Sequence, residues 1–320
     1  MPLKTFFVAL TLSLIGTLPA PAQDRYPSKP ITIVTPITAG TTIDILARLF
    51  ADGLSKKFGQ QVIVLNRPGA GGIIAAQAVA NAAPDGYTIL LANSGHVILG
   101  SLNKQLPFDP LNDFAGINLV GVAPAIVNVA PSLGVRNLRE FVDLAKAKPG
   151  SINYGSAGIG TATHLAGAYF GLQTGTNLVH VPYTVSSTII ADLLGGRIQA
   201  SFSPAAFTLP LLQDGKLLGL AVAADEPVKE PIQIPTAASQ NIDYKFATWY
   251  GLLASAKTPK AVLQTLNEAI TAVGDDAETQ AKVRVQGITP QRIGLAEFDA
   301  YIRNDMDRLA PVMKSISAEK

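Results

Sequence analysis

The chain has 320 residues, of which 48% are hydrophobic and 15% are charged, and its formal net charge is +2. This length suits two domains of ordinary size, and the composition excludes a disordered or coiled-coil protein. The 25 basic residues form no basic stripe, so we expect no nucleic-acid partner. Because there is no cysteine, disulfides, thiol nucleophiles and zinc–thiolate sites are excluded.

The N-terminal segment has the pattern of a secretory signal peptide. Lys4 supplies a basic start, residues 6–18 are apolar, and Ala20-Pro-Ala22 forms a small-residue cleavage pattern. The apolar stretch is too short to span a bilayer comfortably, although an uncleaved anchor helix is the alternative. We therefore expect residues 1–22 to be a signal peptide cleaved near Ala22, and the mature protein to be periplasmic.

Strand and helix patterns alternate in the first third of the chain. Short β-branched or apolar runs predict strands at 31–35, 61–65 and 87–91. From Ile43 to Leu54, apolar residues fall at i, i+3, i+4, i+7 and i+11, which is one face of a helix. Residues 73–81 are also helical in pattern. This alternation is typical of an α/β fold with largely parallel sheets.

A long apolar stretch then leads into a second unit of the same kind. Residues 119–129 could form a strand that carries the chain from one domain to the next. The remaining strands are predicted at 152–154, 178–181, 199–202, 217–223 and 248–254. Helices are predicted at 138–146, 161–172, 189–194, 207–213, 261–273, 277–285 and 298–313, and a surface loop at 226–235.

One local arrangement, a strand followed by a Gly/Thr-rich loop and a helix, occurs in both units. The first loop ends at Gly40 and Thr41, and the second ends at Gly160 and Thr161, with each threonine in an N-cap position. Each loop would direct unpaired N–H groups and the positive end of a helix dipole at one point, which favours an anion. Two ordinary turns are the alternative, but two matched loops in two domains favour a shared cleft.

Other chemical motifs are weaker. Gly69–Gly72 resembles a dinucleotide fingerprint, but Ile74 stands where the third glycine should be. Ser156 and His164 could serve an exported hydrolase, but Tyr154 replaces the first glycine of a nucleophile elbow. The three histidines lack metal-ligand spacing. We therefore expect no catalytic residue, metal or cofactor.

With these two loops, about ten phrases in order resemble the Bug receptors, the solute-binding components of tripartite tricarboxylate transporters. The phrases include Tyr26–Val34, Asp44–Arg48, Asn66–Gly72, Ala83–Thr88, Leu106–Pro110, Ala145–Gly150, His164–Gly167, Val179–Tyr183 and Asp192–Gly196.

The resemblance implies a non-enzymatic receptor with a two-domain periplasmic binding protein fold (type II-like). Each domain would be a mixed, mostly parallel sheet flanked by helices, with the ligand in the interdomain cleft. The expected domains are 23–123 with 248–320, and 124–247, with hinges in the crossing strands near 120–127 and 248–253. The partners would be the membrane subunits of a transporter, although a sensor with a signalling partner is the alternative. A monomer is expected.

The expected ligand is a small organic acid. The residues predicted to contact it are Thr38, Ala39, Gly40, Thr41, Thr42, Asn93, Ser156, Gly158, Ile159, Gly160, Thr161, His164, Tyr183 and Ser203. Charged residues common in the family are replaced here, by Thr184-Val185, Ala168 and Ser203. Because the ammonium group of an amino acid would need a carboxylate partner, these replacements favour a di- or aromatic carboxylate.

Overall fold

The computed structural model describes residues 26–103, 105–229 and 232–318. The predicted signal peptide and its cleavage site lie outside the described residues. Within the described part of the chain, no helix is both long enough and apolar enough to cross a membrane.

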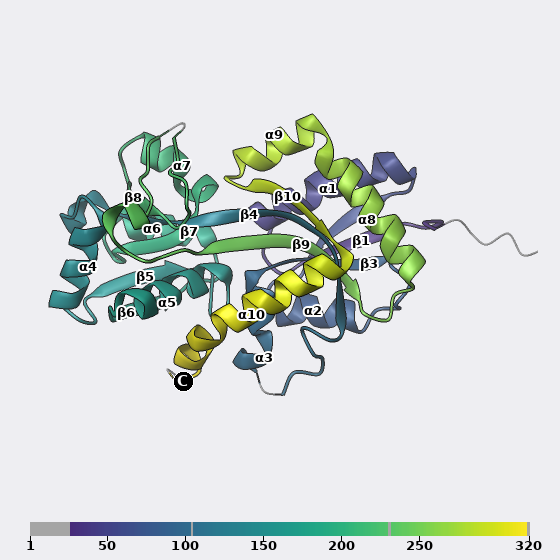
Figure 1. Ribbon diagram of the computed structural model, residues 1–320, viewed down its shortest axis with the longest axis horizontal. Helices are drawn as coiled ribbons and strands as arrows, with labels where there is room; N and C mark the ends of the chain where they lie inside the picture. The colour runs from purple at the N-terminus through teal and green to yellow at the C-terminus, as the bar shows by residue number, and fades with distance from the viewer. Residues whose placement is uncertain (1–25, 104, 230–231, 319–320) are drawn as a thin grey trace, which may run out of the picture.

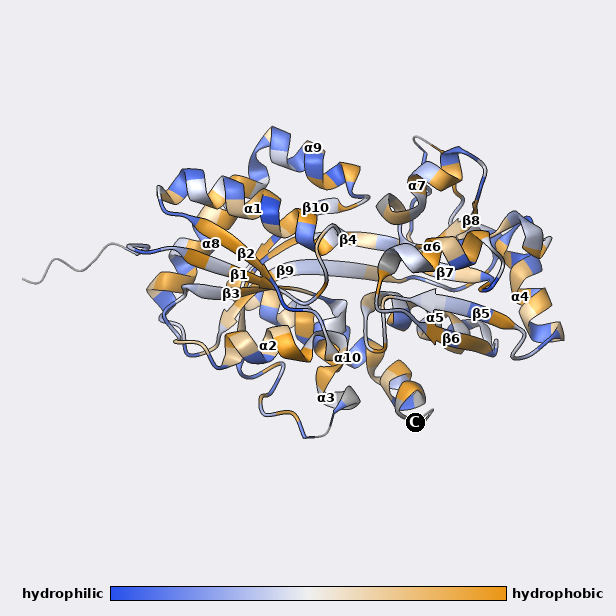
Figure 2. Ribbon diagram, turned by 180° about the vertical axis from the view of Figure 1, so that it is seen from behind, coloured by the Kyte–Doolittle hydropathy of each residue, from blue (hydrophilic) through white to orange (hydrophobic). Residues whose placement is uncertain are grey.

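The first lobe is built on parallel strands that alternate with helices, as their sequence pattern predicts. Strand order is β2-β1-β3, and β1 pairs in parallel with both neighbours. The apolar face of α1 is buried on this sheet, while its other face is exposed. Figure 2 shows hydrophobic residues in orange and hydrophilic residues in blue on this helix. The elements are β1 (Ile31–Thr35), α1 (Thr42–Phe58), β2 (Val62–Asn66), α2 (Ile73–Ala80) and β3 (Thr88–Asn93).

The second lobe repeats the scheme with β5 at the centre of a parallel group, β7-β5-β6. Its core joins apolar residues of α4, β5, α5 and β7, including Phe141, Phe170 and Phe202. The elements are α4 (Leu138–Ala147), β5 (Ile152–Ser156), α5 (Ala162–Thr174), β6 (Leu178–Pro182), α6 (Ser186–Leu194), β7 (Ala200–Pro204), α7 (Ala205–Gln213) and β8 (Leu218–Val222).

Two long antiparallel strands connect the lobes (Figure 1). β4 (Phe114–Val129) pairs with β9 (Ala247–Ser255) as far as Pro124, and with β7 and β8 beyond it. The partner of β4 therefore changes where the sequence predicts the domain boundary. In the part of the chain that the structure describes, ten strands form one mixed sheet with helices on its faces, which confirms the predicted α/β class.

The last described segment contains three predicted helices, α8 to α10. It also contains one strand, β10, which the sequence pattern did not predict. Strand β10 (Thr289–Gly294) pairs antiparallel with β4, although its sequence TPQRIG has no apolar alternation. The helices are α8 (Lys260–Asp275), α9 (Ala277–Val285) and α10 (Leu295–Ala318). Short helical turns occupy Ala70–Gly72, Ser94–Ile98, Leu99–Leu102 (α3), Pro131–Leu133 and Ala238–Gln240. The predicted loop at 226–235 contains no helix or named strand in its described residues.

Helix α10 contacts both lobes, as Figure 1 shows for its path beneath the crossing strands. Its Phe298 packs edge-on against Trp249 of β9, with ring centroids 5.6 Å apart. The guanidinium of Arg308 lies over the rings of Tyr169 and Phe246, at 5.5 and 5.4 Å from their centroids. Trp249 is fully buried, so it is a core residue.

Candidate functional site

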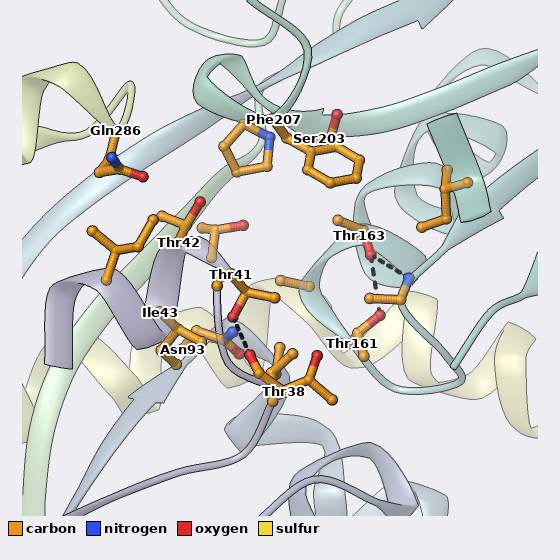
Figure 3. Close-up of a pocket in the computed structure, with 18 of the residues that line it drawn as sticks. Thr38, Thr41, Thr42, Ile43, Asn93, Thr161, Thr163, Ser203, Phe207 and Gln286 are labelled. Atoms are coloured by element: carbon orange, nitrogen blue, oxygen red, sulfur yellow. Dashed lines mark hydrogen bonds between the residues drawn. The ribbon is translucent and has the colours of Figure 1, made fainter. Parts of the chain in front are cut away.

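A cavity of about 580 Å³ lies between the two lobes. Both predicted loops contribute to its wall, which places the starts of α1 and α5 on one space (Figure 3). Its lining residues come from seven segments and are Ile37–Ile43, Ile45, Asn93, Ala157, Thr161–Thr163, Val185, Ser187, Ile189, Ile190, Ser203, Pro204, Phe207, Leu211, Thr248, Tyr250 and Gln286.

The first loop is held by hydrogen bonds within its own backbone and side chains. Gly40, at φ 81°, donates its N–H to Oδ2 of Asp44 at 2.9 Å. The hydroxyl of Thr41 donates to the carbonyl of Thr38 at 2.9 Å. Thr41 does occupy the N-cap position of α1, but its side chain makes no capping hydrogen bond, contrary to the usual role of such a residue.

The carboxylate of Asp44 holds this loop in place. It is 2% exposed and also accepts hydrogen bonds from Arg48 Nε at 3.0 Å and from Asn66 Nδ2 at 2.9 Å. Burial opposes ionisation of the carboxyl, but the bonds from Arg48, Gly40 and Asn66 outweigh it and lower the pKa of Asp44. The carboxylate is therefore fully engaged in hydrogen bonds within the first lobe, and Asp44 does not line the cavity.

The second loop repeats this arrangement with different residues. Gly160, at φ 82°, donates its N–H to Nδ1 of His164 at 3.1 Å. The hydroxyl of Thr161 donates to the carbonyl of Gly158 at 2.7 Å and, like Thr41, does not cap its helix. Asp44 and His164 are thus equivalent: each lies four residues after the loop glycine, is 2% exposed and accepts the glycine N–H.

As a result, the first amides of both helices remain available. Among the described residues, the N–H groups of Thr42, Ile43, Ala162 and Thr163 donate to no other protein group. All four residues line the cavity. The uncapped N-termini of two helices, 17 and 13 residues long, therefore converge on one space. Unpaired amides at helix N-termini bind anions without the help of a basic side chain.

The comparison with known sequences identifies the family. Residues 46–318 of this chain match the sequence profile of the tripartite tricarboxylate transporter family receptor. The chain belongs to this receptor family. Protein BugT of Bordetella pertussis is 28% identical over 315 residues, covering 98% of this chain and 97% of BugT.

Two solved structures have the same fold. The R. palustris protein Rpa4515, solved with adipate, is 29% identical, with a TM-score of 0.84 over 91% of this chain and 98% of that one. The periplasmic binding protein BugD is also 29% identical, with a TM-score of 0.82 over 91% of this chain and 98% of BugD. The two-domain periplasmic binding protein fold and the predicted family are thereby confirmed.

Eight of the fourteen residues predicted for the site of this receptor line the cavity, namely Thr38, Ala39, Gly40, Thr41, Thr42, Asn93, Thr161 and Ser203. The structure does not bring the other six to its surface. Ser156 and His164 are buried behind the second loop, where they support its backbone.

The remaining four belong to the second loop and its neighbour. Gly158 and Gly160 shape the backbone of the loop, and Ile159 is 44% exposed away from the cavity lining. The hydroxyl of Tyr183 donates to Asp192 at 2.8 Å. Burial first, and then the bond to this carboxylate, raise the pKa of Tyr183 to about 12.

The sequence reasoning missed the wall made by the second lobe. Val185, Ile189 and Ile190 of the α6 region and Phe207 and Leu211 of α7 all line the cavity. These residues follow strands whose carboxyl ends meet at the same edge of a parallel sheet as the predicted loops. That strand order, once known, would have pointed to them.

Two stacked histidines lie behind the second loop of the receptor. The rings of His164 and His180 are 3.8 Å apart, and Nε2 of His180 lies 2.6 Å from the hydroxyl of Ser156. Burial, and for His164 also the neighbouring His180, lower the pKa of His164 to about 3 and that of His180 to about 4. The neutral form of His164 is the one that can accept the Gly160 N–H at Nδ1.

We expect receptor stability to fall on acidification because of these histidines. Burial also lowers the pKa of His96 to about 4. Folded pKa values below the ordinary 6.5 mean that the unfolded chain binds protons first, so stability is full above pH 6.5 and declines toward pH 4. The limiting slope is about 1.4 kcal/mol per pH unit for each histidine.

Urea unfolding between pH 7.5 and 4.5 measures this slope. The variant His164→Gln keeps an acceptor for Gly160 and should have a shallower dependence than the parent. A parent curve that is flat, or one that rises as the pH falls, would contradict the assignment of neutral buried imidazoles.

Proposed function

We propose that this protein is an extracytoplasmic receptor that captures a small organic carboxylate and delivers it to the membrane subunits of a tripartite tricarboxylate-type transporter. The observation that carries the proposal is the pair of matched loops, whose four unpaired amides belong to residues that line one cavity between the lobes. The family membership and the adipate in a related receptor support the same chemistry.

The available donors match the affinity that a receptor needs. Micromolar binding corresponds to about 8 kcal/mol. Each hydrogen bond to a charged group contributes about 1.5–3 kcal/mol, so four amides would contribute about 6–12 kcal/mol before the cost of association. Thr38 and Thr42 also line the cavity, and their hydroxyls can add further donors.

The ligand is an organic acid and not an amino acid. None of the lining residues is acidic, so an ammonium group would have no ionised partner in the cavity. We infer no catalytic role for this protein. The hydroxyl of Ser156 is paired with His180 instead of His164, is fully buried, and lies outside the cavity lining.

The receptor acts as a monomer with domains 23–123 plus 248–320, and 124–247, after removal of residues 1–22. A carboxylate first binds one helix start, and closure about β4 and β9 brings the second helix start to it. Closure follows from contacts that exist only in the closed state. The change of strand partner at Pro124 supports a hinge in this region.

A thermal-shift screen of the mature protein against organic acids tests the function. A ligand at 100 times its dissociation constant stabilises the folded state by about 2.7 kcal/mol, which raises the melting temperature by several degrees. We expect a shift with at least one carboxylate and none with the corresponding amide or amine. Equal shifts with the acid and its amide would refute carboxylate recognition, because an amide has no charge for the helix starts to stabilise.

A further inference from the structure

The cavity is uncharged over its entire described surface. Its polar lining consists of hydroxyl and amide side chains, and no lysine, arginine, histidine, aspartate or glutamate belongs to it. The basic residue on α1 closest in sequence to the loop, Arg48, is already bound to Asp44. The starts of α1 and α5 can therefore bind one carboxylate, and the lining contains no basic side chain that could bind a second one.

Beyond the start of α5, the wall that the second lobe contributes is mostly apolar, although Ser187 and Ser203 also belong to it. Val185, Ile189 and Ile190 face the cavity from one helix region, and Phe207 and Leu211 from the next. Ile45 joins them from α1; Ile45 is 39% exposed and Val185 is 53% exposed. Figure 3 shows Phe207 across the cavity from Thr38, while Thr41 lies beside Thr38. Exposed apolar side chains in a cleft gain free energy when a ligand's apolar surface covers them.

A second carboxylate would have to rely on the starts of α6 or α7. These two helices are nine residues long, against 17 and 13 for α1 and α5, and α7 follows β7 without an intervening loop, so their starts do not repeat the loop arrangement of α1 and α5. Beside the amides of α1, Thr38 and Thr42 of the first loop also line the cavity. A second charge in this part of the cavity would lose its water without gaining an ionic partner.

We propose, on the basis of the proposed function, that this receptor selects monocarboxylates with an apolar body, such as medium-chain or aromatic acids, over dicarboxylates. The carboxylate occupies the space between the helix starts, and the carbon chain or ring lies against Phe207, Ile190 and Ile45. This proposal keeps the aromatic part of the sequence-based expectation and replaces its dicarboxylate part, whereas the related Rpa4515 was solved with the dicarboxylate adipate.

Calorimetry at pH 8 with hexanoate and adipate tests the selection directly, because these acids have the same six-carbon chain and differ in one carboxylate. We expect hexanoate to bind at least tenfold more tightly. Affinity should also rise up to about fourfold per methylene from butyrate to hexanoate, as burial of a CH₂ group predicts. Benzoate, compared with phthalate, provides the aromatic pair.

Two variants locate the effect on the apolar wall. Phe207→Ala should weaken hexanoate about tenfold and butyrate much less, while Leu172→Ala, at an exposed residue outside the cavity, should change neither. Ile45→Lys supplies the missing cation and should shift the preference toward adipate by at least tenfold.

The outcomes separate this inference from the function on which it rests. Adipate binding as tightly as hexanoate, or more tightly, would overturn the monocarboxylate assignment and leave the carboxylate receptor intact. Binding of none of the five acids, together with no response in the wider screen, would overturn both.

Discussion

Replacing Thr42 by proline is expected to weaken carboxylate binding roughly ten- to hundredfold and to leave the fold unchanged. Thr42 is the first residue of α1, and its N–H is one of the four unpaired amides in the cavity. Proline removes this donor and places its ring where the ligand oxygen would lie. The loss of one hydrogen bond to a charged group costs about 1.5–3 kcal/mol, which gives the stated range.

The helix should tolerate this change. Proline is favoured at the first position of a helix, where the N–H has no intrahelical partner. The preceding Thr41 has φ −84° and ψ 162°, a conformation that a residue before proline readily adopts. We therefore expect the free energy of unfolding in the absence of ligand to change by no more than about 0.5 kcal/mol, a typical surface effect.

Two control variants isolate the amide. Thr42→Val keeps the N–H and removes the hydroxyl, so it should bind more tightly than the proline variant. Ala277→Pro makes the same change at the exposed first residue of α9, after Asp276 at φ −61° and ψ 132°, and should bind like the parent. Calorimetry with the best acid from the screen measures all three. Parent-like affinity in Thr42→Pro would show that the α1 amides do not contact the ligand.

The two loops could be predicted because their chemistry is local. Glycine before threonine, at the junction of a strand and a helix, is visible in the sequence at Gly40 and Gly160. The four-residue spacing from these glycines to Asp44 and His164 is also visible. The sequence does not show that both side chains accept the glycine N–H, because an aspartate in a first turn usually caps its own helix. Here the threonine hydroxyls bond to carbonyls three residues earlier, and the caps remain open.

Contacts that depend on strand order could not be predicted. Ser156 pairs with His180 because β5 and β6 are neighbours in register, and no periodicity in the chain shows this. Similarly, the apolar residues of α6 and α7 have the pattern of ordinary core helices. Only the packing of the lobes shows that Phe207 faces a cavity and not a core.

Removing the carboxylate of Asp305 is expected to destabilise the protein by about 2–4 kcal/mol. Asp305 of α10 is 7% exposed and accepts hydrogen bonds from Nε1 of Trp249 at 2.9 Å and from Nη2 of Arg308 at 2.6 Å. In Asp305→Ala the indole N–H is left buried without a partner, and the guanidinium loses its counter-ion. The expected destabilisation is smaller than for a fully buried ion pair because the Arg308 side chain is 35% exposed.

The replacement Asp305→Asn separates hydrogen bonding from charge. Burial raises the pKa of Asp305, although Arg308 and Trp249 act in the opposite direction. A folded pKa above the unfolded value means that ionisation costs stability as the pH rises through this range, and the amide removes that cost while still accepting from Trp249. We therefore expect Asp305→Asn to lose less than half as much stability as Asp305→Ala at pH 7, and the gap between Asn and the parent to widen at pH 4.

Urea denaturation of both variants, with Asp307→Ala as control, tests this account. Asp307 lies two residues along the same helix and is exposed, so its loss should change stability by less than about 0.5 kcal/mol. Because Arg308 also covers Tyr169 and Phe246 of the second lobe, Asp305→Ala should loosen the contact between α10 and that lobe. Faster amide exchange at Tyr169 and Phe246 in this variant, but not in Asp307→Ala, is the expected sign. Equal stability of the two alanine variants would mean that the Trp249–Asp305–Arg308 contacts do not hold the lobes to α10.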